Sequence, residues 1–323
     1  MPDNWLMSGP AHLIVPFASC NDLTALELAR GLPLPNLERL LARLTATTHQ
    51  GGDEWTLTPP HERVLAQACG IAAPDGCVPW AAWQRRQDGQ DPGTAAWAWV
   101  TLCHWQVGNS QVALQHPQRL GLDAEESQAL LETVAALARE DGLTLHYDGP
   151  TRWLACGELL RGLPTASLDR VIGRDLDPWM PDGDAARPLR RLLGEVQMLL
   201  HDHPVNEQRE RGGQLPVNSV WISGSGALPA NAPTAPAEGL RVPHHLRDAA
   251  LLADWEAWAE GWRLIDAGEC VQLLDRADRG DPVTLTLCGE RASQRFELLP
   301  RSLFKQLAGR MARVRAWDVL EPL

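Results

Sequence analysis

Short apolar runs alternate with helix-like segments along this chain, and the alternation limits its possible folds more than any other feature. Residues 12–15 and 283–289 are apolar runs that predict buried strands. Leucines repeat at helical spacing over 37–44, and another helical segment covers 23–30. Strands that alternate with helices build an α/β sheet. We therefore predict an α/β fold with a mostly parallel sheet flanked by helices.

The middle third has a different pattern. Residues 123–142 predict a long helix, with Asp123 as N-cap, Glu126 completing a capping box and Gly142 ending it. Two short strands around the turn at 148–150 then predict a β-hairpin. We expect this part to form an inserted, smaller α+β domain.

Composition shifts suggest the domain boundaries. Residues 71–92 are rich in Gly, Pro, Asp and Gln, which is typical of a boundary. The predicted organisation is a first part of the α/β core over 1–88, an inserted domain over 89–184 and a second part of the core over 185–323. A Pro- and Ala-rich loop at 227–240 is expected to be mobile.

Cap and turn residues predict where several helices begin and end. Gly31 is the expected C′ residue of the helix at 23–30, and Asn36 the expected N-cap of the next one. A long helix is predicted from 186 to 201, and a last one from 301 to 312.

Charge and cysteine content exclude some classes of partner. The 323 residues have a formal net charge of −12, which disfavours nucleic acid because phosphate backbones require clustered cations. No apolar run is long enough to span a bilayer, and residues 1–10 lack the pattern of a signal peptide. Seven scattered cysteines without a CxxC pair predict reduced thiols. We expect a cytoplasmic protein without nucleic-acid or membrane partners.

One polar segment stands out against this background. The stretch HPVNEQRERGGQLPVNSVWISGSG, residues 203–226, surrounds a short apolar strand with His203, Asn206, Arg209 and Asn218. It resembles the signature of the archaeal-type, cofactor-independent phosphoglycerate mutases, in which a long helix leads into a His-Pro-Val-Asn segment. That family then has an Arg, a Gly, a Pro-Ala-Asn step, a strand and a Gly-x-Gly turn. Val217 replaces the Ala of that step here.

Weaker similarity extends the resemblance over roughly the first 226 residues, including the helical segment after Pro35 and the helix after Asp123. The chain also resembles a bacterial branch described as RpfE-type regulatory proteins. The resemblance implies the alkaline-phosphatase superfamily fold, an α/β core interrupted by a substrate-side domain. It also implies two divalent metal ions held by Asp and His, with a Ser that carries the phosphoryl group.

The family's catalytic groups are replaced at several of the matching positions. The first strand should end in a metal-binding Asp, but Val15 is followed by Pro16 and Phe17. His61 occupies the position of the nucleophilic Ser, and Pro60 replaces the glycine that lets the backbone approach phosphate. His61 is a weak candidate for a catalytic residue, and the alternative interpretation is a capping or packing role.

The family's later metal ligands are also missing. After Gly226 the chain offers His244 and His245 without an Asp-His step, and the last strand region has Glu290 and Arg291 without a His. A two-metal centre would lack charge and geometry. We therefore expect no metal and no cofactor, with Mn or Zn as the alternative.

Other clusters favour structural interpretations. They are a helix end at 201–203, acidic residues 175, 177, 182 and 184 in a solvated loop, the pair Cys103-His104 on opposite strand faces, and the glycine pattern at 224–226.

The polar segment itself has two interpretations. As an interdomain clamp, Asn206 and Asn218 would bridge backbone groups and Arg209 would pair with a carboxylate. As a residual anion site, it would be lined by Arg170, Arg174 or Arg209. His203 belongs to the same set, and we favour the clamp.

Three functional hypotheses follow. The first is a catalytically degenerate, phosphoglycerate-mutase-like protein that regulates by binding an unknown protein partner or a small anionic ligand. The second is an active metal-dependent phosphomutase or phosphatase with a rearranged site. The third is a structural subunit of a larger assembly.

Overall fold

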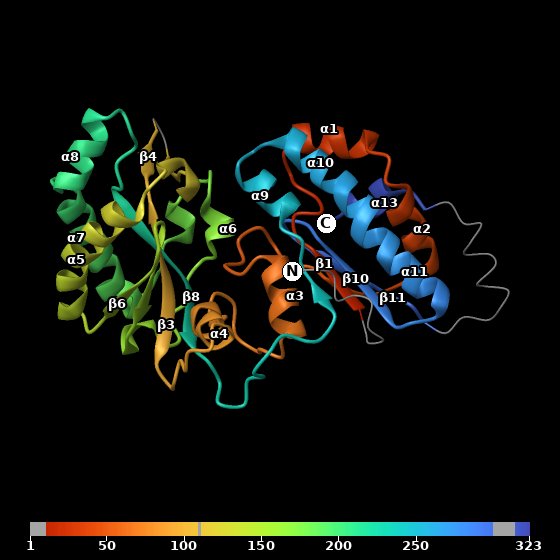
Figure 1. Cartoon of the computed structure of the whole chain (residues 1–323), viewed down its shortest axis with the longest axis horizontal. Coiled ribbons are helices and arrows are strands. Elements are labelled where there is room, and N and C mark those ends of the chain that lie inside the picture. Colours follow the sequence, from red (N-terminus) through yellow and green to blue (C-terminus); the bar gives the residue numbers. More distant parts are fainter. Residues whose placement is uncertain (1–10, 109–110, 300–313) are drawn as a thin grey trace. The chain divides into compact units, whose positions relative to one another are not determined.

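The computed structural model describes residues 11–108, 111–299 and 314–323 (Figure 1). The helix predicted at 301–312 lies outside these residues. The chain divides into two compact units. The first comprises Met1–Glu54, Pro59–Cys69 and Pro236–Leu323, and the second comprises Trp55–Thr58 and Gly70–Ala235. No helix in the described part of the chain is long and apolar enough to cross a membrane.

The first unit contains a five-stranded sheet. Its order is β2 (Thr45–Gln50), β11 (Ser293–Glu297), β10 (Val283–Cys288), β1 (Ala11–Val15) and β9 (Leu240–Arg241). Strand β1 is parallel to both β10 and β9, whereas β10–β11 and β11–β2 are antiparallel.

The prediction of a mostly parallel sheet is therefore wrong. Only residues 289–292 connect β10 to β11, and a connection this short permits a hairpin but no crossover. The polar strand β2, which pairs at the edge of the sheet, was not predicted either. The mixed α/β character itself is confirmed.

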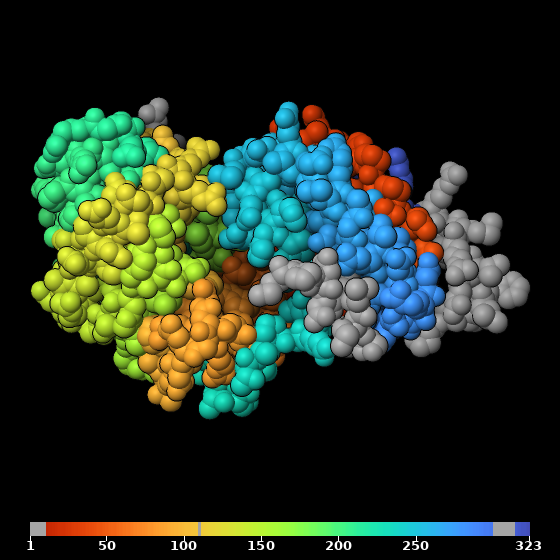
Figure 2. Space-filling model, in the orientation of Figure 1, coloured from red at the N-terminus to blue at the C-terminus, as the bar shows by residue number. Residues whose placement is uncertain are grey.

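Helices cover the two faces of this sheet unequally (Figure 1). The bounds of the helices in this unit are α1 Leu23–Gly31, α2 Pro35–Arg43, α3 Pro60–Ala68, α9 His245–Leu251, α10 Trp255–Ile265, the π-helical segment η6 Asp266–Cys270, α11 Val271–Arg279 and α13 Ala316–Leu320. Most pack over the apolar face that holds Leu13, Leu285 and Phe296, and α3 packs on the opposite face. Helices α10 and α11 form a continuous blue surface in Figure 2.

The start of α2 differs from the prediction. Leu34, and not Asn36, is the N-cap residue, and Pro35 opens the helix. The carboxylate of Asp266 lies at this helix start and accepts from the backbone N–H of Leu37 at 2.7 Å and from Asn36 Nδ2 at 3.0 Å. An ionised acceptor that binds several N–H groups caps a helix more strongly than a neutral amide does. Gly31 is the last residue of α1 and not its C′ residue.

The second unit is built on an antiparallel sheet. The four strands run in the order β6 (Thr144–Gly149), β7 (Arg152–Cys156), β3 (Ala96–Cys103) and β8 (Ser219–Ala227), and β4 (Trp105–Val107) pairs with β5 (Val112–Leu114). The helices are α4 Trp80–Gln87, α5 Ala124–Glu140, α6 Leu168–Val171, α7 Arg187–His201 and α8 Pro204–Arg211, with short 3-10 turns η2 Pro117–Leu120, η3 Glu158–Leu160, η4 Asp177–Trp179 and η5 Asp184–Ala186.

Local sequence signals in this unit are confirmed. Asp123 and Glu126 form the predicted capping box at the start of α5, and β6 and β7 form the predicted hairpin. Helices α5 and α7 pack together (Figure 1) and share one hydrophobic core, to which Leu130 and Leu193 belong. Because α7 and β8 help to enclose this core, the compact unit has wider bounds than the range 89–184 predicted for the inserted domain.

Gly289 lies in a turn that packs against the backbone of Leu323. The backbone N–H groups of Arg291 and Ala292 both donate to the Leu323 carbonyl oxygen at 3.1 Å. A Cβ atom added to Gly289 would lie 2.5 Å from the Leu323 carbonyl carbon. Only glycine therefore lets the segment that contains α13 pack at this turn.

We predict that Gly289→Ala displaces this segment and destabilises the protein by about 1–3 kcal/mol, the usual cost of overpacking. Hydrogen exchange should increase over residues 316–323 and chemical denaturation should shift. Gly268→Ala is the matched control, because a Cβ there meets nothing within 4 Å. Equal stability of the two variants would contradict the contact.

The face of the first sheet opposite its main core includes a half-buried histidine. His12 Nε2 lies 2.8 Å from Thr286 Oγ1. Burial, followed by the charge of Arg295, lowers the pKa of His12 to about 4 from an ordinary value of 6.5, against a smaller opposing effect of Glu297. The imidazole is therefore neutral at pH 7.

The depressed pKa makes stability depend on pH. Between pH 6.5 and about 4 the unfolded chain binds a proton at His12 that the folded chain does not, so acidification removes stability. The loss amounts to about 3 kcal/mol by linkage. We predict that His12→Gln loses less stability than the unsubstituted protein over this range in urea denaturation. Parallel pH profiles for the two proteins would contradict the assignment.

Candidate functional site

The carboxyl ends of β1 and β10 form the first candidate site. They are adjacent parallel strands, and ligands of α/β proteins bind outside such strand ends. Val15 ends β1, and Pro16, Phe17 and Ala18 follow, all buried. Phe17 has a positive φ of 53°, a conformation that costs a non-glycine residue about 1–3 kcal/mol.

Hydrogen bonds hold the Phe17 turn in this conformation. Trp258 Nε1 donates to the Phe17 carbonyl oxygen at 2.9 Å, and the Ala18 N–H donates to the Cys288 carbonyl oxygen at 2.8 Å. Burial raises the pKa of the Cys288 thiol, which ends β10, so that group stays neutral. The two strand ends therefore present an aromatic residue and a thiol where a divalent cation would need carboxylates or imidazoles.

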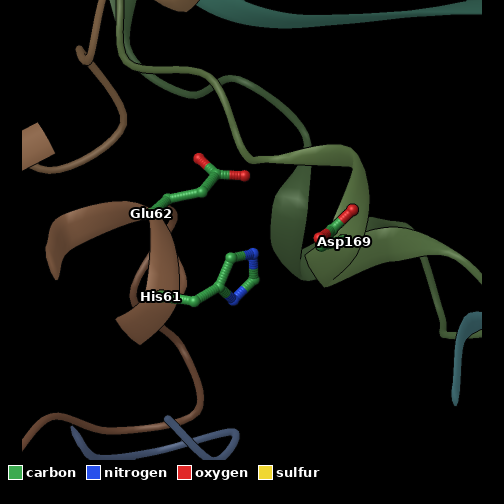
Figure 3. Close-up of side chains that lie close together, drawn as sticks. All are labelled: His61, Glu62 and Asp169. Carbon is green, nitrogen blue, oxygen red and sulfur yellow. The ribbon is translucent and has the colours of Figure 1, made fainter. Parts of the chain in front are cut away.

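Helix α3 positions His61 beside this turn. His61 and Glu62 both lie in the first turn of α3, after Pro59 and Pro60 (Figure 3). The His61 ring is 7% exposed and its centroid lies 5.4 Å from that of Phe17, with the planes tilted by 44°. The sequence correctly places His61 at a helix N-terminus, and its contact with Phe17 is a packing contact.

Two carboxylates that follow β1 and β10 in the sequence have local partners. Asp22 caps α1 by accepting from the Thr24 N–H at 2.8 Å. Glu290, which follows β10, accepts from Asn21 Nδ2 at 2.8 Å. His244 and His245, which follow Gly226 in the sequence, lie at the start of α9 and are exposed.

The polar segment 203–226 lies in the second unit. Asn206 is buried and bonds three backbone groups: its Nδ2 donates to the carbonyl oxygens of Leu200 at 2.8 Å and Val217 at 2.7 Å, and its Oδ1 accepts from the Val217 N–H at 2.8 Å. One side chain thus joins the end of α7 to the residues that lead into β8.

Arg209 makes a second set of bonds from α8. Its side chain is fully buried, and Nη1 donates to Glu126 Oε2 at 2.7 Å. Nε donates to the Leu215 carbonyl oxygen at 2.9 Å, and Nη2 donates to that of Leu120. Because Glu126 is also the capping-box residue of α5, Arg209 links α8 to the start of α5.

His203 and Asn218 complete this set. His203 Nδ1 accepts from the Val205 N–H at 3.2 Å, so its Nε2 carries the proton and donates to Thr133 Oγ1 at 3.0 Å. Burial lowers the pKa of His203, in keeping with this neutral form. Asn218 bonds both backbone groups of Trp105, at 2.7 and 2.9 Å.

The two remaining candidate arginines lie near α6. Arg170 is 2% exposed and donates from Nη2 to Thr56 Oγ1 at 2.7 Å, and Arg174 is half-buried after the helix. The described contacts of Arg170 and of Arg209 thus go to different elements. Figure 3 also labels Asp169, a buried carboxylate in the first turn of α6.

The glycine pattern at 224–226 lies inside β8 and not in a turn after it. Gly224 has φ +61°, and a Cβ there would lie 2.9 Å from the Trp99 ring. This glycine therefore allows close packing of a tryptophan. Cys103, of the pair Cys103-His104, is buried, and burial raises the pKa of its thiol.

Comparison with known proteins gives a weak, local similarity. No family model matches the chain. It is 29% identical over 105 residues to a 2,3-bisphosphoglycerate-independent phosphoglycerate mutase of Methanothrix thermoacetophila, which covers 32% of this chain and 26% of that protein. The same enzyme of Methanosarcina barkeri is 26% identical over 114 residues, covering 35% and 29%. The matched segment thus spans less than a third of these relatives.

Two solved structures align over almost the whole chain. The cofactor-independent phosphoglycerate mutase from Thermoplasma acidophilum is 12% identical, with a TM-score of 0.37 and coverage of 98% and 99%. The PH0037 protein from Pyrococcus horikoshii is also 12% identical, with a TM-score of 0.38 and coverage of 98% and 96%.

We predict that Arg209→Ala destabilises the protein by about 3–5 kcal/mol, because it leaves Glu126 partly buried without its cation. Urea denaturation measures this cost. The matched control is Arg211→Ala in the same helix, whose ion pair with Glu207 is exposed and worth about 0.5 kcal/mol or less. A stable Arg209→Ala protein would indicate that the guanidinium has no structural role.

Proposed function

We propose that this chain is a phosphoglycerate-mutase-like protein without the two-metal phosphotransfer centre, and that it acts by binding. The local similarity to phosphoglycerate mutases supports the likeness to that family alone. The RpfE-type regulatory branch and a cytoplasmic location belong to the same proposal. Its partner would be a protein or a small anionic ligand, since a net charge of −12 disfavours nucleic acid.

The Phe17 turn is the observation on which this proposal depends. Two divalent cations need several carboxylate or imidazole groups at one place, and catalysis by such a pair needs a defined separation between the ions. Instead, the end of β1 has a buried aromatic residue whose carbonyl oxygen is bonded to Trp258. The residues at this strand end do not fit a metal pair, and we derive no reaction step through one.

His61 and Glu62 favour a second candidate, an active metal-dependent phosphomutase or phosphatase with a rearranged site. Both side chains offer ligand atoms for Mn or Zn, and both lie in the first turn of α3 (Figure 3). A helix N-terminus also attracts phosphate. We place this candidate second because the end of β1 lacks the carboxylate or imidazole groups that a metal pair needs.

A combined metal and activity assay separates the two candidates. We predict that the purified protein, incubated with Mn²⁺ or Zn²⁺ and desalted, retains far less than one ion per chain. It should neither interconvert 2- and 3-phosphoglycerate nor hydrolyse p-nitrophenyl phosphate. The Methanosarcina barkeri relative serves as the positive control. Two retained ions with turnover would overturn the proposal.

His61→Gln and Glu62→Gln add a matched test. Under the binding proposal, both variants have the same metal content as the unsubstituted protein. If the unsubstituted protein instead holds stoichiometric metal and either variant loses it, α3 carries a metal site and the second candidate function is supported.

A further inference from the structure

The face of the first sheet that α3 covers presents polar residues where the opposite face is apolar. Thr286 on β10 is opposite Arg295 on β11, and Cys288 is opposite Ser293, so each pair lies on one face of the sheet. The neighbouring strand adds His12, bonded to Thr286. Buried polar side chains on a sheet face require partners.

A cavity of about 130 Å³ lies on this face. Strands β2, β10 and β11 and the second half of α3 supply its lining, which consists of Thr48, Gln50, Val64, Gln67, Ala68, Thr286, Ser293 and Arg295. The volume holds several waters or one small organic molecule.

Ser293 brings a hydroxyl group to this cavity. The residue is 2% exposed, and its neighbours in the lining include Gln50 and Arg295. Gln50 Nε2 donates to Gln67 Oε1 at 2.8 Å, and these amides keep further donors for a ligand. A serine hydroxyl can both donate to and accept from a bound polar group.

The charge of the lining selects the class of ligand. Arg295 is the one charged residue of the lining, and its Nε and Nη2 both reach Glu297 Oε1, at 2.9 and 2.8 Å. Its remaining N–H groups can still form a fork with a carboxylate. One partly neutralised cation balances a single negative charge and not a phosphate dianion.

The lining also has a small apolar part. Val64 and Ala68, one turn apart on α3, face the cavity together with the polar side chains. A ligand with a short aliphatic group beside its charge would cover these side chains and exclude water from them.

We propose that this cavity binds a small monocarboxylate, whose carboxylate contacts Arg295 and Ser293 and whose aliphatic part packs on Val64 and Ala68. The site lies within the first unit and does not rest on the proposed function. Retention of metal ions by the protein would overturn the proposed function but would not bear on this carboxylate site.

The test is titration of the ¹⁵N-labelled full chain with acetate, propionate and lactate at pH 7, followed by NMR. We expect saturable shifts confined to the cavity-lining segments, with a Kd in the millimolar range, and about tenfold weaker binding in Arg295→Gln and in Ser293→Ala. The side chain of Arg295 is 41% exposed, so its substitution should leave the fold intact. Arg263→Gln, which removes an exposed ion pair in α10, should bind as the unsubstituted protein does.

Inorganic phosphate is the competing probe in the same titration. Tighter binding of phosphate than of any carboxylate would overturn the proposal, because it would require more positive charge than this cavity has. Absence of saturation up to about 50 mM, or equal affinity in Arg295→Gln, Ser293→Ala and the unsubstituted protein, would overturn it as well.

Discussion

The turn at Phe17 is the constraint on which the account of the first unit depends. A parallel strand pair offers its carboxyl ends as a ligand site, and the chain closes this one with a strained, buried aromatic residue. The strain persists because Trp258, from α10, donates to the Phe17 carbonyl oxygen. A residue placed for metal chemistry would need a ligand atom, whereas the Phe17 side chain has none and packs against the ring of His61.

The second unit depends on a different interaction, the buried pair of Arg209 and Glu126. This pair joins the start of α5 to α8, and Asn206 joins the end of α7 to the approach to β8. The described bonds of Asn206 and Arg209 all remain inside this unit. Their polar atoms are used by backbone groups and one carboxylate, which gives this conspicuous sequence segment a structural role. An anion-binding or interdomain role for the segment stays a proposal.

Local signals predicted the structure better than long-range ones. The capping box at Asp123, the hairpin of β6 and β7 and the helix α7 follow from spacing within about one helical turn or one strand. The cap of α2 could not be predicted from local spacing, because Asp266, which accepts hydrogen bonds at the helix start, is 230 residues away in the sequence. The antiparallel β11 and the polar edge strand β2 also depend on partners that no local pattern specifies. For the site, the missing carboxylate after Val15 was visible in the sequence. The packing of Phe17 on His61 and the polar cavity under α3 required the structure.

The most direct test of the central claim is anomalous diffraction at the manganese edge from crystals soaked in Mn²⁺. The account predicts no anomalous peak at the carboxyl ends of β1 and β10, where Phe17 and Cys288 lie. A pair of peaks there, whatever side chains held the ions, would contradict it.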